Sequence, residues 1–455
     1  MSPGCFDIFE AAAAHGEGLA VVCGDEEHTY AELAVQVARE QERLHMQGAL
    51  RAPRVVMHGR PTVETMVRVL ALLRYGVPMV MLHPRLSPAE QETVIQQSQP
   101  AMLLDAACEA SPEPGPVPPP PAAIDPERIA AVFFTSGSSG TPKGAMLSRR
   151  AFAAACAAHT QNLGWTSSDR WLLCLPLAHI GGFSVLMRCL YARSCVVLAP
   201  DAGTPTLVRA IEQQRVTLVS LVPTQLQRLL RHAPSFAPPP WLRAVLVGGA
   251  AMTQSLKQQA CQRGLPVLAT YGLTEACAQV ATEPPGRPAP AGSVGRALLP
   301  GSVVIKDGHI LLRGPALMTG YLGAPALAPD ALFDTQDLGA LDDDGWLYVY
   351  GRGTDLVISG GENVHPQEVE DVLQTLPGIE AAVVFGRADP EWGQVVCAAV
   401  ILSPGARIQA EAWTEALRSR LARFKHPRAW YEVQDFAQTR SNKVDRRAVA
   451  QVCLR

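Results

Sequence analysis

The chain has 455 residues, which is long enough for two or three domains. With 48% of the residues hydrophobic and 18% charged, it can bury a large core, which argues against a disordered protein. Its formal net charge of −3 gives no electrostatic basis for binding nucleic acid or an anionic membrane. The eleven cysteines include no Cys-x-x-Cys pair, which favours reduced thiols in a cytoplasmic protein over a zinc site or a disulfide framework.

Helical and extended patterns alternate along the first hundred residues. Apolar residues recur at helical spacing in 30–46 and 62–75, and short apolar runs at 54–57 and 78–82 predict strands. This alternation is typical of a parallel sheet covered by helices. The proline-rich segment 111–126 then predicts a surface loop. No basic region precedes an apolar stretch at the N-terminus and no apolar run could span a bilayer, so we expect neither a signal peptide nor membrane insertion.

The alternation resumes after residue 128. Apolar runs at 130–134, 243–248 and 265–270 predict buried strands that end in turns. A charged, glycine-bearing stretch at 342–355 interrupts the pattern, and we place a domain boundary near Gly353.

Two domains are therefore predicted, with an overall α/β fold. Residues 1–352 form a large, multi-layered α/β domain, and residues 353–455 form a small, mobile α+β domain. Within the small domain we expect a helix at 366–376, a strand at 381–385 and a second helix at 410–423.

A loop rich in glycine and hydroxyl groups follows the strand at 130–134. Glycines let backbone N–H groups approach an anion closely, and hydroxyls and a lysine add donors and positive charge, which is what a triphosphate requires. The loop lacks the Gly-Lys-Ser/Thr of a P-loop, and the apolar runs close to it on both sides disfavour a flexible linker. The candidate phosphate-binding residues are Thr135, Ser136, Gly137, Ser138, Ser139, Gly140, Thr141 and Lys143.

With this loop, the sequence resembles the adenylate-forming superfamily of acyl-CoA synthetases, adenylation domains and luciferases over nearly its whole length. The segment from Tyr271 through Gly272 and Thr274 to Glu275 is similar to the family's adenylate motif. The resemblance implies that Tyr271 lies along adenine, Thr274 binds the α-phosphate and Glu275 holds Mg²⁺. An aromatic face can stack on a base, and a carboxylate suits a hard cation. The backbone rim beside adenine is expected at Gly248, Gly249 and Ala250.

Residues 335–339 resemble the family segment whose aspartate binds the ribose hydroxyls. Asp337 occupies that position, and Arg352 matches a second ribose contact. Gln336 stands where the family usually has glycine, so the local turn is left open. A surface salt bridge is the structural alternative for Asp337 and Arg352.

The start of the small domain, residues 354–370, resembles the family motif that follows the interdomain hinge. Thr354 stands at the hinge, where Asp or Lys is commoner, and Gly360 and Gly361 match the backbone of the pantetheine tunnel. Residues 439–446 resemble the catalytic-lysine motif, which implies that Lys443 bridges the attacking carboxylate and the α-phosphate. A solvated basic tail is the structural alternative.

The stretch 175–191 resembles the acyl-pocket segment of the superfamily, with His179 near the mouth. Arg188 lies in an apolar helical pattern, where a cation is costly unless paired. An internal partner or an anionic group of the substrate would satisfy it. With residues 220–226 and 421–424, this stretch is similar to 2-succinylbenzoate–CoA ligases, whose substrate carries two carboxylates and a keto group.

The resemblance implies a cytoplasmic ATP-dependent acid–CoA ligase that uses Mg²⁺ and coenzyme A and passes through an acyl-adenylate. A ligase for another aryl or fatty acid and a domain that loads a carrier protein are alternatives. From a different class, a P-loop NTPase or nucleotide-binding regulator would release ADP and phosphate rather than AMP and pyrophosphate. The sequence leaves open whether the protein is a monomer or a homo-oligomer.

Overall fold

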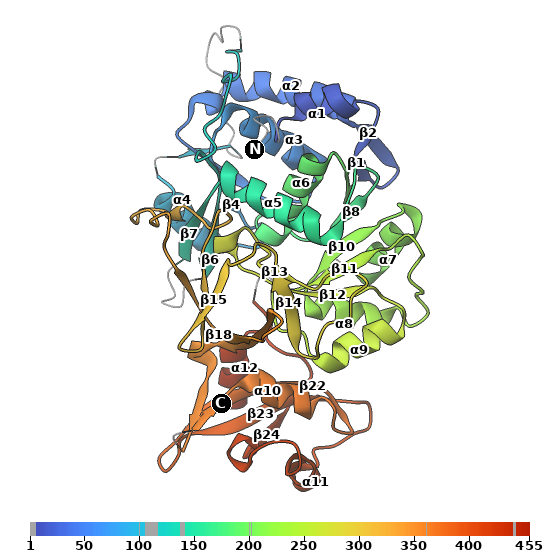
Figure 1. Ribbon diagram of the computed structural model, residues 1–455, viewed down its shortest axis with the longest axis vertical. Helices are drawn as coiled ribbons and strands as arrows, with labels where there is room; N and C mark the ends of the chain where they lie inside the picture. Colours follow the sequence, from blue (N-terminus) through green and yellow to red (C-terminus); the bar gives the residue numbers. More distant parts are fainter. Residues whose placement is uncertain are drawn as a thin grey trace.

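The computed structural model describes residues 6–99, 101–104, 117–136, 142–199, 201, 203–360, 362–439 and 443–455, without the side chains of Ser136 and Thr354. Helices and sheets alternate in a large N-terminal part, and a smaller part at one end of the molecule carries the C-terminus (Figure 1). This mixed architecture confirms the predicted α/β fold class. None of the helices formed by the described residues is long and apolar enough to cross a membrane.

The helices begin close to the predicted positions. Thr62, for example, caps the helix that follows it, because its hydroxyl accepts a hydrogen bond from the Thr65 N–H. The α-helices are α1 (Ile8–His15), α2 (Tyr30–Met46), α3 (Val63–Tyr75), α4 (Pro88–Gln97), α5 (Arg149–Leu163), α6 (Ile180–Ala192), α7 (Thr204–Gln213), α8 (Pro223–His232), α9 (Gln254–Gln262), α10 (Pro366–Leu373), α11 (Ala410–Leu417) and α12 (Arg446–Cys453).

The largest sheet joins a parallel half to an antiparallel half. Its strands follow the order β15-β16-β18-β19-β14-β13-β12-β11-β10-β8-β9-β1-β2, and neighbours from β12 to β1 run parallel. The strands are β1 (Leu19–Cys23), β2 (Glu26–Thr29), β8 (Arg170–Leu173), β9 (Cys195–Leu198), β10 (Leu218–Leu221), β11 (Ala244–Val247), β12 (Val267–Tyr271), β13 (Ala281–Thr282), β14 (Ser293–Ala297), β15 (Val303–Lys306), β16 (His309–Leu312), β18 (Phe333–Leu341) and β19 (Trp346–Arg352).

Two further sheets complete the fold. The second has the order β17-β7-β6-β4-β3-β5, and the third, in the small C-terminal part, has the order β21-β20-β23-β22 with β24 beside β23. Their strands are β3 (Val55–His58), β4 (Met79–Leu82), β5 (Met102–Leu103), β6 (Ile129–Ser136), β7 (Pro142–Ser148), β17 (Gly320–Tyr321), β20 (Val357–Ser359), β21 (Glu362–Val364), β22 (Ile379–Asp389), β23 (Gly393–Leu402) and β24 (Ala429–Glu432).

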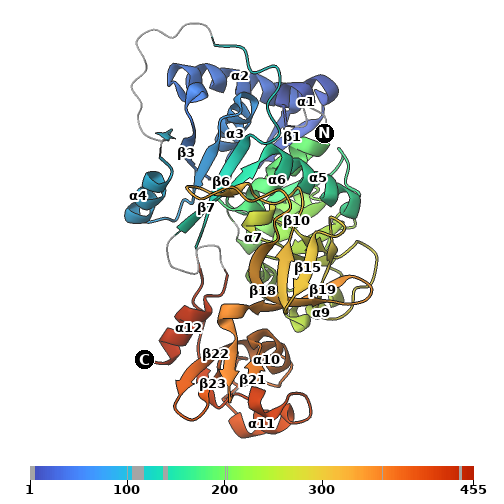
Figure 2. The same cartoon turned by 60° about the vertical axis from the view of Figure 1, so that its left-hand side comes forward.

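The small C-terminal part has its own apolar core. Val369, Leu373, Trp413 and Leu417 are buried against one face of its sheet, and a second cluster forms on the other face around Phe385. Among the described residues, no buried cluster combines side chains from both sides of residue 353. In the view of Figure 2, this part lies below the rest of the chain.

Three details of the sequence prediction are wrong. The helix expected at 410–423 ends at Leu417, because the chain turns there so that Leu421 joins the core. The helix expected at 366–376 ends at Leu373, before the Gln374–Leu376 turn. The charged stretch at 342–355 contains strand β19, in which Trp346 and Leu347 are buried. The proline-rich loop is confirmed for residues 117–126, and 111–116 lie outside the described residues.

The carboxyl ends of β10, β11 and β12 lie side by side, because Leu221, Val247 and Ala269 are in register. The chain leaves β11 through Gly248 and β12 through Gly272, so both turns open at the same edge of the sheet. In parallel sheets, this edge is where ligands bind.

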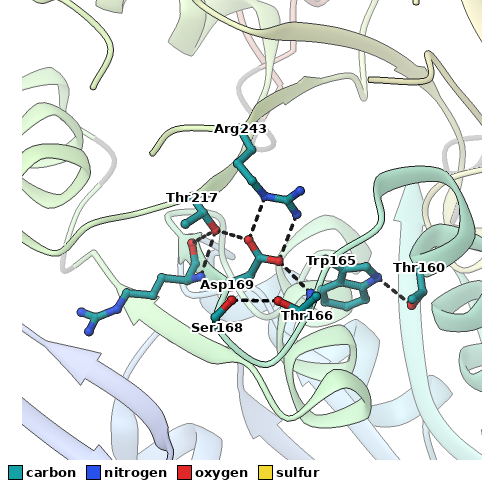
Figure 3. Close-up of polar contacts among 8 residues, drawn as sticks. Thr160, Trp165, Thr166, Ser168, Asp169, Thr217 and Arg243 are labelled. Atoms are coloured by element: carbon teal, nitrogen blue, oxygen red, sulfur yellow. Dashed lines mark hydrogen bonds and ion pairs between the residues drawn. The ribbon is translucent and has the colours of Figure 1, made fainter. Parts of the chain in front are cut away.

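A charged network lies at the opposite edge of the sheet, at the amino-terminal ends of β8, β10 and β11 (Figure 3). Asp169 precedes β8 and accepts two hydrogen bonds of 3.0 Å from Arg243, which precedes β11. The Thr217 hydroxyl, before β10, donates to the same carboxylate at 2.7 Å, and so does the Thr166 N–H at 2.8 Å. Since Asp169 is only 4% exposed, these donors replace the water it loses on folding.

Arg243→Met is therefore expected to lower the free energy of unfolding by about 2 kcal/mol, because a buried carboxylate loses two charge-assisted hydrogen bonds. Denaturation in urea measures this change. Arg418→Met is the matched control, since Arg418 pairs with Glu415 at a solvent-exposed position and such pairs contribute little to the free energy of unfolding. Equal stability losses in the two variants would contradict the structural role of the Asp169 network.

Candidate active site

A cavity of about 540 Å³ lies at the carboxyl edge of the large sheet, between that sheet, the β18–β19 hairpin and the small C-terminal part. Most of the predicted nucleotide-binding residues line this cavity. They are Thr135, Lys143, Gly249, Ala250, Tyr271, Gly272, Thr274, Glu275, Asp337, Arg352 and Lys443. Segments separated by up to about three hundred residues in the sequence therefore meet around one space.

Several predicted residues do not line the cavity. Gly248 ends β11, where a Cβ would lie 2.6 Å from the Thr270 carbonyl oxygen, so glycine is required there for strand packing. His179, Arg188 and Gly360 also lie outside the cavity wall. Gly137, Ser138, Ser139, Gly140, Thr141 and Gly361 lie outside the described residues, as does the side chain of Ser136.

Tyr271, Asp337 and Arg352 form a connected polar group on the cavity wall. The Tyr271 hydroxyl donates to Asp337 Oδ2 at 2.7 Å, and Arg352 Nε lies 2.9 Å from Asp337 Oδ1. Antiparallel pairing of β18 with β19 sets Asp337 directly opposite Arg352. Burial raises the pKa of the Asp337 carboxyl, while Arg352 acts to lower it. The group presents fixed polar atoms to a ligand.

Gln336 retains the turn that glycine would make beside Asp337. Its φ is 62°, in the left-handed region, and its side chain is exposed. A residue with a Cβ in this region costs about 1–2 kcal/mol. The Gln336 N–H donates to Asp334 Oδ1 at 2.7 Å, which helps to hold the turn. The substitution therefore leaves Asp337 in place.

Glu275 lies in a short 3₁₀ helix (Thr274–Ala276) directly after β12. Its backbone carbonyl accepts from the Met318 N–H at 2.8 Å, and its carboxylate Oε1 accepts from the Tyr321 hydroxyl, also at 2.8 Å. Tyr321 was not predicted from the sequence. No local signal identifies it, since it is 46 residues from Glu275 and approaches only because β17 pairs with β7.

Lys443 enters the cavity from the small C-terminal part. The Thr439 N–H donates to the Lys443 carbonyl at 2.7 Å, and the Lys443 N–H donates to Thr439 Oγ1 at 3.2 Å. The side chain passes over Gly249, where a Cβ would lie 3.5 Å from Lys443 Cε. Burial lowers the pKa of Lys443, Arg352 lowers it further, and the nearby carboxylates of Asp337 and Glu275 act against both.

His179 precedes α6 and lies against His83, with 4.7 Å between the ring centroids. Burial, His83, Lys443 and Arg85 together lower the pKa of His179 to about 3. The ring is therefore neutral at physiological pH, and it lies close enough to Lys443 for the lysine charge to contribute to the lower pKa.

Arg188 is buried in α6, with 2% of its surface exposed. Its guanidinium carbon lies 5.3 Å from the centroid of the Trp171 ring, and burial lowers the pKa of Arg188 to about 10. Within the described part of the chain, no carboxylate pairs with it. The fully buried His159 is close enough for Arg188 to lower the pKa of its ring. Arg188 is thus a desolvated cation without a counter-ion among the residues that the structure describes.

Gly360 turns between β20 and β21 with φ of 61°, where a Cβ would lie 2.8 Å from the Trp392 ring. Only glycine suits such a position. This turn does not line the cavity that Lys443 enters. Lys443 and Gly360 therefore occupy different positions relative to the cavity in this conformation.

Comparison with known proteins gives matches along most of the chain. Residues 8–322 match the family model described as AMP-binding enzyme, and residues 368–443 match that of the AMP-binding enzyme C-terminal domain. The sequence is 33% identical to the 2-succinylbenzoate–CoA ligase of Bacillus licheniformis, over 94% of this chain and 95% of that protein.

Solved structures of a Bacillus subtilis relative, o-succinylbenzoate CoA synthetase (MenE), are similar to this one. Its complex with the acyl-adenylate intermediate OSB-AMP gives a TM-score of 0.83 at 28% identity, covering 99% of this chain and 98% of that one. Its complex with ATP and magnesium ion gives a TM-score of 0.81 at 28% identity, covering 97% of this chain and 98% of that one. A double mutant of this relative, bound with its product analogue OSB-NCoA, gives a TM-score of 0.69 at 28% identity, covering 99% of this chain and 98% of that one.

Proposed function

Because this chain belongs to the AMP-binding enzyme family, we propose that it is an ATP-dependent ligase that joins 2-succinylbenzoate to coenzyme A. The observation that carries this proposal is the single cavity lined by Tyr271, Glu275, Asp337, Arg352 and Lys443, the residues that the family motifs supply for an adenylate. The full-length similarity to 2-succinylbenzoate–CoA ligases supports the choice of acid.

The reaction has two steps. First, a carboxylate oxygen of the acid attacks the α-phosphorus of ATP, the bond to the bridging oxygen breaks, and pyrophosphate leaves. The sulfur of coenzyme A, having lost its proton, then attacks the acyl carbon and AMP leaves with the electron pair of the broken C–O bond. Splitting the reaction through a reactive intermediate replaces one difficult step with two easier ones.

The cavity residues fit Mg·ATP. Adenine would lie along Tyr271, and the ribose hydroxyls would bind Asp337 and Arg352. The Thr274 hydroxyl would donate to the α-phosphate, and the Glu275 carboxylate would hold Mg²⁺, which in proteins commonly binds one or two carboxylates together with phosphate oxygens. When bound, the ion neutralises charge on the phosphates.

The small domain is proposed to comprise residues 353–455 and to rotate about Thr354 between the two steps. Lys443 lies in the cavity while Gly360 does not, so the arrangement in this structure presents only Lys443, and the proposed rotation would bring Gly360 to the cavity. The Bacillus subtilis relative supports this proposal, because its similarity to this chain is lower with the product analogue than with the acyl-adenylate at equal identity. A rigid rotation of one domain would have this effect.

We assign the carboxylate that is not activated to Arg188, with His179 at the entrance to the acyl site. A buried cation without a counter-ion is costly, and an anionic substrate group would provide the counter-ion. Since Arg188 is buried and does not line the cavity, this assignment requires side chains near Arg188 to move when the acid binds. The distal carboxylate is the feature that distinguishes this acid from benzoate or a fatty acid.

The test is a panel of acids offered with ATP and coenzyme A, scored for thioester, AMP and pyrophosphate. We expect 2-succinylbenzoate to be preferred over benzoate and fatty acids. Preference for another acid would refute the substrate assignment, and release of ADP and phosphate would refute the ligase assignment. Thioester formation on a carrier protein but not on coenzyme A would indicate a loading domain.

Asp337→Ala is expected to raise the KM for ATP about 10-fold or more, because hydrogen bonds to a charged group are each worth about 1.5–3 kcal/mol. The KM for coenzyme A should change little. Asp343→Ala, in the exposed turn of the same hairpin, is the control and should alter neither constant. An unchanged KM for ATP in Asp337→Ala would remove this residue from the nucleotide site.

We further propose that the enzyme acts in the cytoplasm on small molecules. The nine cysteines among the described residues are free thiols, which is typical of a reducing compartment.

A further inference from the structure

Tyr321 connects two parts of the cavity that belong to different sheets. It lies in β17, which pairs with β7, the strand that follows the phosphate-binding loop; Tyr321 is opposite Ala145. The backbone on either side is also fixed, since the Thr319 N–H donates to the Met146 carbonyl at 2.8 Å and the Leu322 N–H to the Gly144 carbonyl at 2.7 Å. The tyrosine therefore projects from a backbone tied on both sides.

Its side chain contacts two groups of opposite charge. The phenol donates to Glu275 Oε1 at 2.8 Å, and Lys143 Nζ lies 5.5 Å from the centroid of the same ring. A phenol is protonated at neutral pH, so Tyr321 can donate this hydrogen bond. The ring can also attract the Lys143 ammonium through its face.

We propose that Tyr321 is a positioning residue for the metal and phosphate site: it orients the Glu275 carboxylate toward Mg²⁺ and restrains Lys143 beside the phosphates. This inference rests on the proposed function, in which Glu275 is a metal ligand. The phenol occupies one lone pair of Oε1 and so restrains the orientation of the Glu275 carboxylate, while Oε2 is left for the metal. Groups that hold a metal ligand in this way typically contribute 10–100-fold in metal affinity.

The test is the binding of Mn²⁺, as a paramagnetic substitute for Mg²⁺, to the enzyme saturated with an ATP analogue whose α,β-bridge cannot be cleaved. Electron paramagnetic resonance of free Mn²⁺ gives the Kd without any turnover. We expect Tyr321→Phe to raise this Kd about 10-fold and to increase the Mg²⁺ concentration needed for half-maximal adenylate formation by a similar factor. Its melting temperature should stay close to that of the wild type, since the ring remains.

Tyr348→Phe is the matched control. Its hydroxyl donates to Asp342 Oδ2 at 3.1 Å in the β18–β19 hairpin, so the variant removes the same kind of bond away from the cavity wall and should leave the Kd for Mn²⁺ unchanged. If Tyr321→Phe lowers kcat without changing the Kd, the tyrosine has another role and the inference is overturned.

Glu275→Gln in the same titration separates the two proposals. If Glu275→Gln weakens Mn²⁺ binding and Tyr321→Phe does not, only the role of Tyr321 fails. If Glu275→Gln binds Mn²⁺ as the wild type does, Glu275 is not a metal ligand. The metal assignment within the proposed function is then refuted, and the role of Tyr321 that depends on it is refuted as well.

Discussion

Replacing Lys443 with alanine is expected to slow acyl-adenylate formation about 100-fold or more. Lys443 enters the cavity beside Asp337 and Glu275, where negative charge spreads over the attacking carboxylate and the α-phosphate as the new bond forms. A fixed ammonium stabilises that charge, and loss of one such donor typically costs 10²–10³-fold in rate. Exchange of labelled pyrophosphate into ATP measures this step.

The same variant should convert preformed acyl-adenylate and coenzyme A to thioester at nearly the wild-type rate. In the proposed rotation, the small domain would have moved before that step, and Lys443 would no longer lie at the reacting atoms. Lys306→Ala, at an exposed position in β15, is the control and should change neither step. Equal losses in both steps for Lys443→Ala would contradict the rotation about Thr354.

For Arg188→Leu, kcat/KM for 2-succinylbenzoate is expected to fall at least about 30-fold. Removal of one partner from a buried charge pair costs about 2–5 kcal/mol, and the lower figure corresponds to this ratio. Benzoate, which lacks the distal carboxylate, should be a poor substrate for the wild type and lose little more on mutation. The interaction between mutation and substrate is the measurement that decides the role of Arg188.

Stability provides the control for this variant. Arg188 has no carboxylate partner among the described residues, and its burial lowers the pKa of the guanidinium, so replacing it with an apolar side chain should leave the melting temperature unchanged or higher. A structural arginine would behave in the opposite way, with a lower melting temperature and equal losses for both acids. Arg188→Glu should abolish use of 2-succinylbenzoate, because like charges would meet in a poorly solvated site.

The amino-acid sequence alone predicted the fold class, the order of the first helices and strands, and the candidate nucleotide-site residues that lie in local motifs. Tyr271, Thr274 and Glu275 are close in sequence, and a short turn after a buried strand suffices to bring them to one edge of a sheet. The spacing of apolar residues likewise indicates which face of a helix or strand is buried, because this spacing is a property of residues that are close in the sequence.

How these segments meet became clear from the three-dimensional structure. The bond from Tyr271 to Asp337 joins residues 66 apart, and the contact of Tyr321 with Glu275 depends on the pairing of β17 with β7. The sequence identified Arg188 as a cation that is costly to bury, but it did not show that Arg188 would be excluded from the cavity lining. Such features depend on long-range packing and on the loss of water around a side chain, which no local pattern of residues encodes.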